Sequence, residues 1–208
     1  PSLITRLAQM TAASGREAET VELLTTLEAQ AKEKLSPLHF TVLDGLVQGW
    51  QARGIAPESL WTKGSPALKK ALAPLRGILA KADELARDEK GTVDDRQKGI
   101  RLLGLAPLAE SEKTLTLLLS PSEPPPVQIA AVRVLAGHTE PRVAEALLAA
   151  WKGYSPTVRR EVVEALLARP QRVAALLDAI EAKKAQPALI EPARLDQLRK
   201  HPDAALRK

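Results

Sequence analysis

The feature that most constrains the fold of this chain is a repeat of about 31 residues in its second half. Three segments align at spacings of 32 and then 31 residues: GIRLLG (99–104), AVRVLA (131–136) and VVEALL (162–167). A second apolar segment follows each of them, at 113–119, 141–151 and 170–180. Proline recurs at 125, 156 and 187, and proline suits the first turn of a helix. Each repeat therefore predicts a pair of antiparallel helices.

The aligned segments share apolar columns, which indicate the buried face of each pair. In the first helices these columns are Ile100, Val132 and Val163; Leu102, Val134 and Ala165; and Leu103, Leu135 and Leu166. In the second helices, Val143 matches Val173 and Leu147 matches Leu177. One hairpin cannot bury both of its apolar faces, so neighbouring units must stack. We expect an all-α fold, an α-solenoid of helical hairpins in a right-handed superhelix, and the pattern resembles HEAT-like repeats. Tetratricopeptide repeats would need a 34-residue period with aromatic positions.

The composition agrees with helices and excludes several kinds of chemistry. Ala, Leu, Glu, Lys and Arg dominate, and only five of the 208 residues are aromatic. The chain has no cysteine, which excludes thiolate nucleophiles, Cys-ligated zinc, iron–sulfur clusters and covalently attached haem. No uncharged stretch exceeds nine residues, so no membrane span is expected.

The first half predicts helices near 2–13, 16–34, 37–53 and 66–90, the last bent at Pro74. Ser36-Pro37, Ser65-Pro66 and Ser155-Pro156 each pair a capping hydroxyl with a proline at the first helical position. Ser14-Gly15 and Gly54 end helices, and residues 54–65 form a connector in which Trp61 fills space under a loop. We expect the domains to be 1–93, a capping bundle or divergent repeats, and 94–208, with units 94–124, 125–155, 156–186 and a partial 187–208. The start at Pro1 within a helical pattern suggests a processed chain or a piece of a longer one.

Polar clusters offer little chemistry. His39, His138 and His201 lack the spacing of metal ligands, so we expect them to cap loops or face solvent. Asp94 and Asp95 fit the start of a helix, where negative charge opposes the helix dipole favourably. No nucleophile elbow or phosphate-binding glycine motif occurs. The net charge of +5 comes mainly from 156–208, where 11 basic residues meet seven acidic ones, and it is too small to indicate nucleic-acid binding.

Aromatic and charged residues of the predicted second helices indicate a binding surface. Trp151 and Tyr154 lie beside Lys152, and they either plug the gap between the second and third units or form a binding platform. We expect the second helices to line the concave face. The candidate partner-binding residues are Arg142, Glu145, Trp151, Lys152, Arg172 and Lys183.

The tail carries three motifs: ARP-x-R-V-x-x-LLDAIE (168–181), P-x-x-x-x-P-A-R-x-x-x-L (187–198) and H-P-D-x-x-L-R (201–207). As a set they resemble the HEAT-like repeat region of planctomycete-type multi-domain membrane-bound dehydrogenase and c-type haem-binding proteins. In that family a β-propeller precedes the repeats and a cytochrome c domain follows. The resemblance covers about 94–208, and 1–93 loosely. It implies a scaffold between these domains in an exported, periplasmic parent, whose haem and catalytic residues lie outside this chain.

These observations predict a non-enzymatic scaffold that binds a protein or the adjoining domains of its parent chain. We expect no cofactor, no metal, no membrane insertion and no small-molecule substrate. The alternative is a HEAT-like alkylpurine DNA glycosylase, a basic helical solenoid that holds its lesion with tryptophans and an aspartate. Trp151 and the basic C-terminal end fit that alternative, but a second tryptophan in the repeats is missing.

Overall fold

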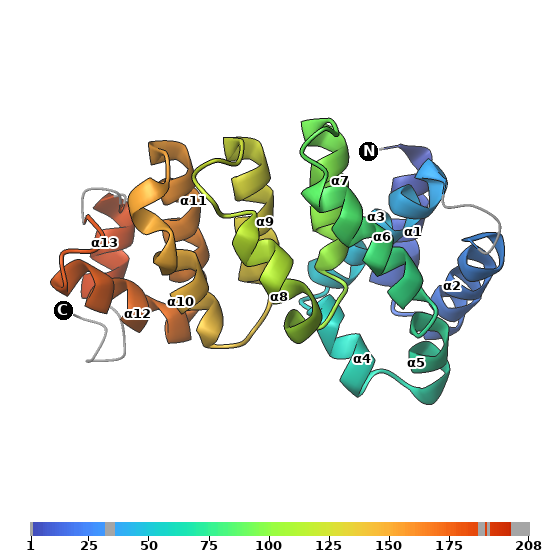
Figure 1. Cartoon of the computed structure of the whole chain (residues 1–208). Coiled ribbons are helices and arrows are strands. Elements are labelled where there is room, and N and C mark those ends of the chain that lie inside the picture. Colours follow the sequence, from blue (N-terminus) through green and yellow to red (C-terminus); the bar gives the residue numbers. More distant parts are fainter. Residues whose placement is uncertain (1, 32–35, 187–189, 191, 201–208) are drawn as a thin grey trace. The chain divides into compact units, whose positions relative to one another are not determined.

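A computed structural model describes residues 2–31, 36–186, 190 and 192–200, and every regular element in these ranges is a helix (Figure 1). The predicted all-α fold is confirmed. The chain divides into two compact units, Pro1–Thr114 and Leu115–Lys208. This division falls within α8, whereas the sequence repeat begins at 94. None of the described helices has the length and apolar character needed to cross a membrane.

The helices of the first unit follow the predicted ones closely. They are α1 (Leu3–Ser14), α2 (Glu17–Ala31), α3 (Pro37–Ala52), α4 (Leu60–Lys63), α5 (Pro66–Leu72), α6 (Leu75–Arg87) and α7 (Val93–Leu103), with a 3-10 turn η1 (Pro57–Ser59). Helix α8 (Leu108–Leu117) begins in this unit and ends in the second. The end predicted for the second helix, at 34, lies outside the described residues. Gly15 and Gly54 both have positive φ, which suits the turns that follow α1 and α3.

Pro74 separates two helices and does not merely bend one. The sequence predicts a single helix over 66–90, but α5 ends at Leu72 and α6 begins at Leu75. Proline has no N–H to donate and its ring clashes with the preceding turn, so the helical hydrogen bonds stop here. This break lets Leu72 and Leu75 both enter the core, where each is no more than 1% exposed.

Helix α3 is the centre of the first unit. Its buried residues include Leu43, Leu46 and Trp50, which belong to one core cluster with side chains of α1, α2, α5 and α6. Helix α1 approaches α3 very closely because Gly45 and Gly49 leave room for it. A Cβ at Gly45 would lie 2.5 Å from the Thr5 carbonyl oxygen and 2.8 Å from Ala8 Cβ.

The connector after α3 is more ordered than the sequence predicts. It contains η1 and α4, and Trp61 of α4 is half-buried. The Trp61 indole nitrogen donates a hydrogen bond to the Leu105 carbonyl oxygen at 2.6 Å. The Arg76 guanidinium covers the ring at 5.0 Å from its centroid and forms an ion pair with Glu110 at 2.7 Å. Trp61 therefore joins the connector to α6 and α8 residues through polar contacts as well as packing.

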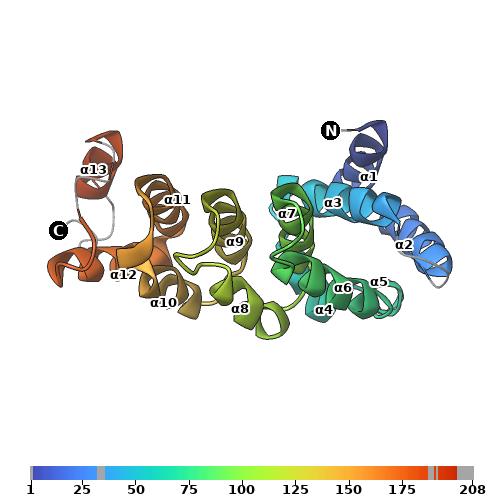
Figure 2. The same ribbon diagram turned by 45° about the horizontal axis from the view of Figure 1, so that its top comes forward.

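The second unit consists of helix pairs. Its helices are α9 (Pro125–Gly137), α10 (Arg142–Ala149), α11 (Pro156–Leu167), α12 (Pro170–Glu181) and α13 (Pro192–Arg199), with a 3-10 turn η2 (Trp151–Gly153). Within this unit α9 packs beside α11 and α10 beside α12, in two layers (Figure 2). The third proline of the sequence period, Pro187, lies outside the described residues, and α13 begins at Pro192.

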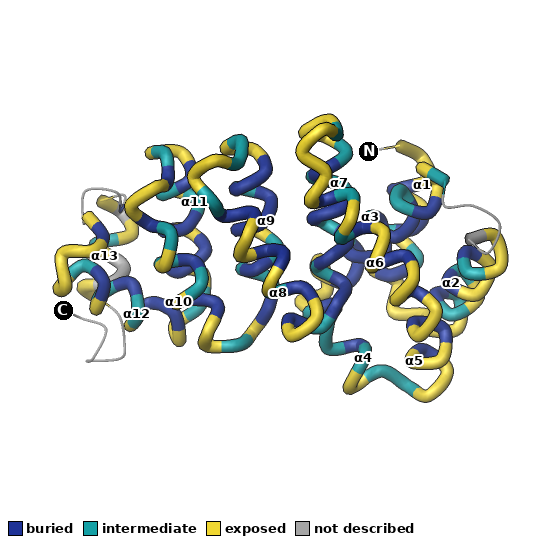
Figure 3. Tube along the Cα trace, viewed as in Figure 1, coloured by how far each residue is buried: buried dark blue, intermediate teal, exposed yellow. Residues whose placement is uncertain are grey.

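The predicted apolar columns face the interior. Ile100, Val132 and Val163 are each at most 1% exposed, and buried positions follow the inner sides of the helices in both units (Figure 3). The Leu102 column is less uniform, because Val134 is only half-buried. In α12 the buried leucine is Leu176, not the predicted Leu177, which is half-buried.

A polar side chain recurs with the same period and caps the end of the preceding helix. Arg96 Nε donates to the Ala86 carbonyl oxygen at 3.0 Å. Gln128 Nε2 donates to the Ser120 carbonyl oxygen at 2.7 Å, and Arg159 donates to the carbonyl oxygens of Trp151 and Lys152 at 3.2 and 3.0 Å. The Ala86 carbonyl oxygen lies in the last turn of α6, and the other three lie in the turns that follow α8 and α10. These donors therefore add a side-chain hydrogen bond to the chain where a helix ends. We call Arg96, Gln128 and Arg159 the end-capping series.

Candidate functional site

Four of the six predicted partner-binding residues are exposed on the second unit. Arg142 and Glu145 lie on the first turn of α10, Lys152 lies in η2, and Lys183 follows Ala182, the C-cap residue of α12. Helices α10 and α12 are neighbours in one layer (Figure 2). Three cations and one anion give this set a net positive charge. We call these four residues the α10–α12 charge set.

Lys183 owes its position to an unusual backbone. Its φ is 57°, which is the left-handed conformation that commonly ends a helix. The Lys183 N–H donates to the Ile180 carbonyl oxygen at 2.9 Å, and the Lys184 N–H donates to the Ala179 carbonyl oxygen at 2.8 Å. These bonds close the last turn of α12 and leave the Lys183 side chain in solvent.

Trp151 is a packing residue, which corrects the binding role predicted for it. Trp151 is 4% exposed and Tyr154 is 3% exposed, so neither ring offers a platform. The Arg159 guanidinium covers the Trp151 ring at 5.8 Å from its centroid. Burial also raises the pKa of the Tyr154 hydroxyl. Of the two interpretations of this aromatic pair, the plug holds, and Trp151 is not placed to hold a flipped base as in a glycosylase.

Arg172 is also buried, which corrects its predicted place on an exposed rim. It is 1% exposed, and it donates to the carbonyl oxygens of Ala136, at 3.0 Å, and His138. Arg169 adds a hydrogen bond to the Gly137 carbonyl oxygen at 2.9 Å. Burial and the neighbouring Arg169 lower the pKa of Arg172 to about 10. Arg172 of α12 and the N-cap residue Arg169 thus cap the C-terminal end of α9, where cations are favourable.

The described histidines are buried, so solvent exposure is the wrong expectation for them. His39 is 2% exposed and His138 is 1% exposed. His39 Nδ1 accepts a hydrogen bond from the Ser36 N–H at 3.0 Å, which makes it part of the cap of α3. His138 is the C-cap residue of α9, and burial lowers its pKa to about 4. His201 lies outside the described residues.

The paired acids at the start of α7 serve the helix end, as predicted. Thr92 is the N-cap residue, and its hydroxyl oxygen accepts from the Asp95 N–H at 3.1 Å. Lys98 forms ion pairs with Asp94 at 2.6 Å and Asp95 at 2.9 Å. Hydrogen bonds from Lys98 and then from Thr92 lower the pKa of Asp95. These contacts account for both carboxylates without a catalytic role.

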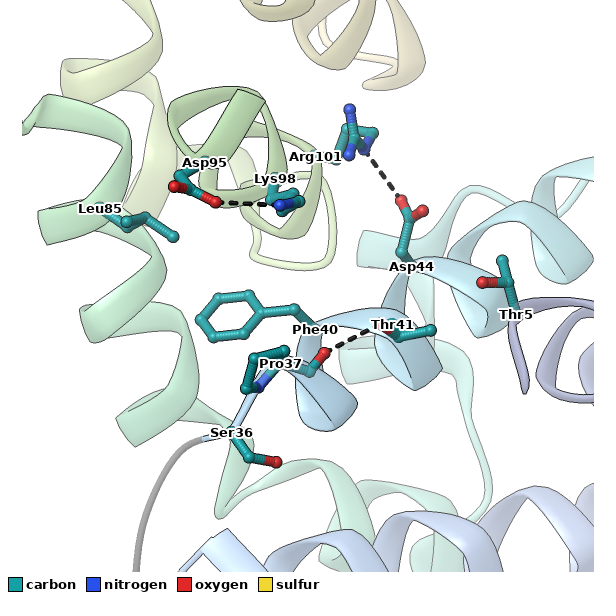
Figure 4. Close-up of a pocket in the computed structure, with 10 residues that line it drawn as sticks. All are labelled: Thr5, Ser36, Pro37, Phe40, Thr41, Asp44, Leu85, Asp95, Lys98 and Arg101. Carbon is teal, nitrogen blue, oxygen red and sulfur yellow. Dashed lines mark hydrogen bonds and ion pairs between the residues drawn. The ribbon is translucent and has the colours of Figure 1, made fainter. Parts of the chain in front are cut away.

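A cavity of about 400 Å³ opens on the first unit, and sequence reasoning did not anticipate it (Figure 4). Its apolar lining comes from Pro37 and Phe40 of α3 and from Leu85 of α6. Its polar lining comes from α1, from α3 and its N-cap residue, and from α7. These residues are Thr5, Ser36, Thr41, Asp44, Asp95, Lys98 and Arg101. Figure 4 shows the Phe40 ring between the side chains of Pro37 and Leu85. A volume of this size is typical of small-ligand pockets.

Comparison with known proteins gives one positive match. Residues 111–191 match the family model of HEAT repeats. This part of the chain is similar to HEAT repeats, which agrees with its helix pairs. The match covers the helix pairs that carry Trp151, Arg172 and the whole α10–α12 charge set. No curated protein and no solved structure matches the chain. The comparisons therefore support a HEAT-like repeat region and do not extend to the dehydrogenase and cytochrome parent that the tail resembles.

The sequence repeat carries one signal that its apolar columns do not show. The end-capping series is visible in the sequence, because Arg96, Gln128 and Arg159 each precede an aligned apolar residue by four positions. A polar residue that recurs in a repeat register indicates a recurring buried hydrogen bond.

Proposed function

We propose that this chain is a non-catalytic scaffold in which the HEAT-like repeat region holds a protein partner or an adjoining domain against the α10–α12 charge set. HEAT repeats generally serve as protein-interaction scaffolds and are typically non-catalytic. Stacked helix pairs present a long, rigid surface, so partner binding needs little reordering of the scaffold.

The observation that carries the proposal is the contrast between buried and exposed polar residues in the repeats. Arg172 and the end-capping side chains Gln128 and Arg159 make hydrogen bonds that hold successive helices together. Arg142 and Glu145 are exposed on α10, and Lys152 and Lys183 are exposed just after the ends of α10 and α12. Charges at the edge of an interface direct encounter and select partners by electrostatic complementarity.

The test compares partner capture by two charge-reversed variants. One carries Lys152→Glu with Lys183→Glu, and the control carries Arg160→Glu with Lys90→Glu, two exposed residues outside the charge set. Each variant changes the net charge equally. We expect a partner that wild type retains from a source extract to bind the first variant at least about tenfold more weakly, and the control within about twofold. Equal retention by both variants would overturn the proposed surface.

The parent protein is a separate part of the proposal. The motifs at 168–181, 187–198 and 201–207 support a scaffold between a β-propeller and a cytochrome c domain in an exported protein, on resemblance alone. Sequencing the complete reading frame tests this directly. A C-x-x-C-H motif downstream of Lys208 agrees with it, whereas a reading frame without propeller or haem motif contradicts it.

A further inference from the structure

The cavity of the first unit combines an apolar floor with a polar rim. Pro37, Phe40 and Leu85 supply the apolar surface, and Asp44 and Arg101 lie across from them (Figure 4). Phe40 and Leu85 are half-buried, so part of each side chain remains available for contact. This arrangement suits a ligand that has an apolar group next to hydrogen-bonding groups.

Most polar groups of the lining already have partners in their own elements. Thr41 Oγ1 donates to the Pro37 carbonyl oxygen at 2.9 Å, and Ser36 Oγ lies 2.9 Å from His39 Nδ1. Asp95 accepts from Lys98 and from the Thr92 hydroxyl, at 2.9 and 2.8 Å. These groups therefore shape the cavity more than they offer hydrogen bonds to a ligand.

The Arg101–Asp44 pair keeps hydrogen-bonding capacity on both members. Arg101 Nε donates to Asp44 Oδ1 at 3.1 Å, and Asp44 Oδ2 accepts from Gln48 Nε2 at 3.0 Å. Neither Arg101 Nη atom donates to another described residue. A carboxylate has about four lone-pair sites, so Asp44 can accept further hydrogen bonds. Donors and acceptors thus lie side by side, which matches the C=O and N–H of a peptide group.

The charges of the lining balance. Asp44 and Asp95 oppose Lys98 and Arg101, so the cavity selects no formal charge. A free carboxylate or a free ammonium group would meet two like and two opposite charges here, so the lining gives neither a net attraction. An uncharged peptide group can use the donors and acceptors without adding a net charge.

We propose that this cavity binds an extended peptide segment of a partner protein, with one apolar side chain against Phe40 and one backbone peptide group on the Arg101–Asp44 pair. This inference rests on the proposed scaffold function and specifies the part of the partner that is bound, an extended peptide segment with one apolar side chain. Main-chain hydrogen bonds would supply affinity, and the apolar floor would select the side chain.

Two substitutions of threonine by tryptophan separate the cavity from the rest of the surface. Thr41→Trp puts a large ring into the lining. Thr25→Trp is the matched control, because Thr25 makes the same hydrogen bond to the carbonyl four residues earlier, at 2.8 Å, on α2 outside the lining. Helical circular dichroism and thermal melts of both variants show whether the fold is kept.

A second pair of variants tests the hydrogen bonds. Arg101→Met removes the guanidinium and keeps an unbranched apolar chain. Arg87→Met is its control, since Arg87 has a similar exposure, 50% against 42%, and donates through Nε to a carboxylate, that of Asp83 at 2.9 Å, but does not line the cavity. We expect Arg101→Met to weaken peptide binding about tenfold, the effect of one hydrogen bond to a charged donor. We expect Arg87→Met to stay within about twofold of wild type.

The experiment selects random twelve-residue peptides displayed on phage against the intact chain, and then measures the enriched peptides, synthesised with capped ends, by fluorescence polarisation. We expect them to share one apolar position, to bind wild type and Thr25→Trp equally, and to bind Thr41→Trp at least about tenfold more weakly. The inference is overturned if no peptide is enriched on wild type relative to the Thr41→Trp variant. It is also overturned if an equimolar concentration of 4-methylpentanoate displaces the bound peptides. A peptide that binds the Thr41→Trp variant as well as wild type, but no longer binds the Lys152→Glu, Lys183→Glu variant, would overturn the cavity inference and support the proposed scaffold function.

Discussion

Replacement of Arg172 by methionine is expected to destabilise the second unit by about 2 kcal/mol. Methionine keeps much of the buried stem and removes the guanidinium. Two hydrogen bonds to a charged donor contribute about 3–6 kcal/mol together, and relief from burying the charge offsets several kcal/mol of this. The remaining loss of stability comes mainly from the His138 carbonyl oxygen, because His138 is buried and this oxygen would lose its donor. Ala136 is only half-buried, so water can replace the donor to its carbonyl oxygen.

Arg169→Met is the matched control for this prediction. Arg169 makes one hydrogen bond, to the Gly137 carbonyl oxygen, and is half-buried. Because water can replace that donor, we expect a loss of about 0.5 kcal/mol. Arg172→Ala should lose more than Arg172→Met, since it also leaves a cavity in place of the stem.

Urea unfolding measures these differences. Trp151 is the tryptophan of the second unit, so a Trp50→Phe, Trp61→Phe background lets its fluorescence follow that unit. A two-state transition is required before free energies are compared. If Arg172→Met were within about 0.5 kcal/mol of its background, the two carbonyl hydrogen bonds would be balanced by the burial of the charge, and the capping argument would be refuted.

Three further predictions follow from burial, close approach and backbone conformation. Burial lowers the pKa of His138 to about 4. Between pH 6.5 and 4 only the unfolded chain therefore takes up a proton at this side chain. The free energy of unfolding keeps the full contribution of His138 above pH 6.5 and falls by about 3 kcal/mol as the pH drops to 4. His138→Gln should lack that part of the pH dependence in urea titrations, and equal slopes would contradict it. Gly49→Ala should destabilise the protein by about 1–3 kcal/mol, because the added Cβ would lie 2.7 Å from Ala12 Cβ. Gly77→Ala should stabilise it by about 0.5 kcal/mol, because no atom lies within 4 Å of the added Cβ. Thermal melts that rank the two variants otherwise would contradict the close approach of α1 and α3. Lys183→Gly should stabilise by about 1 kcal/mol, since glycine adopts a positive φ without strain, and an unchanged midpoint would count against the left-handed turn after α12.

The helices and their pairing were predictable because their signals are local. The Ser-Pro caps begin α3, α5 and α11, and the Ile100 column is buried throughout. The break at Pro74 was not predictable, because a proline ring can either bend a helix or end it, and the packing of Leu72 and Leu75 decides between these.

The candidate sites were only partly predictable. Arginine is ordinarily exposed, so the sequence alone predicts that Arg172 lies at the edge of an exposed surface. Only the tertiary arrangement of α9 and α12 gives its guanidinium carbonyl partners at the end of α9. The cavity brings together Thr5, Phe40, Leu85 and Arg101 from four helices. No sequence spacing relates these residues, because their proximity depends on how the helices pack.

Hydrogen–deuterium exchange of the intact chain, with and without a partner that wild type captures, tests the central claim most directly. The scaffold account predicts that the partner slows exchange at the ends of α10 and α12 and in η2, around Arg142, Lys152 and Lys183, and leaves α9 and α11 unchanged. Slowed exchange confined to α9 and α11, or none in the second unit, would contradict the account.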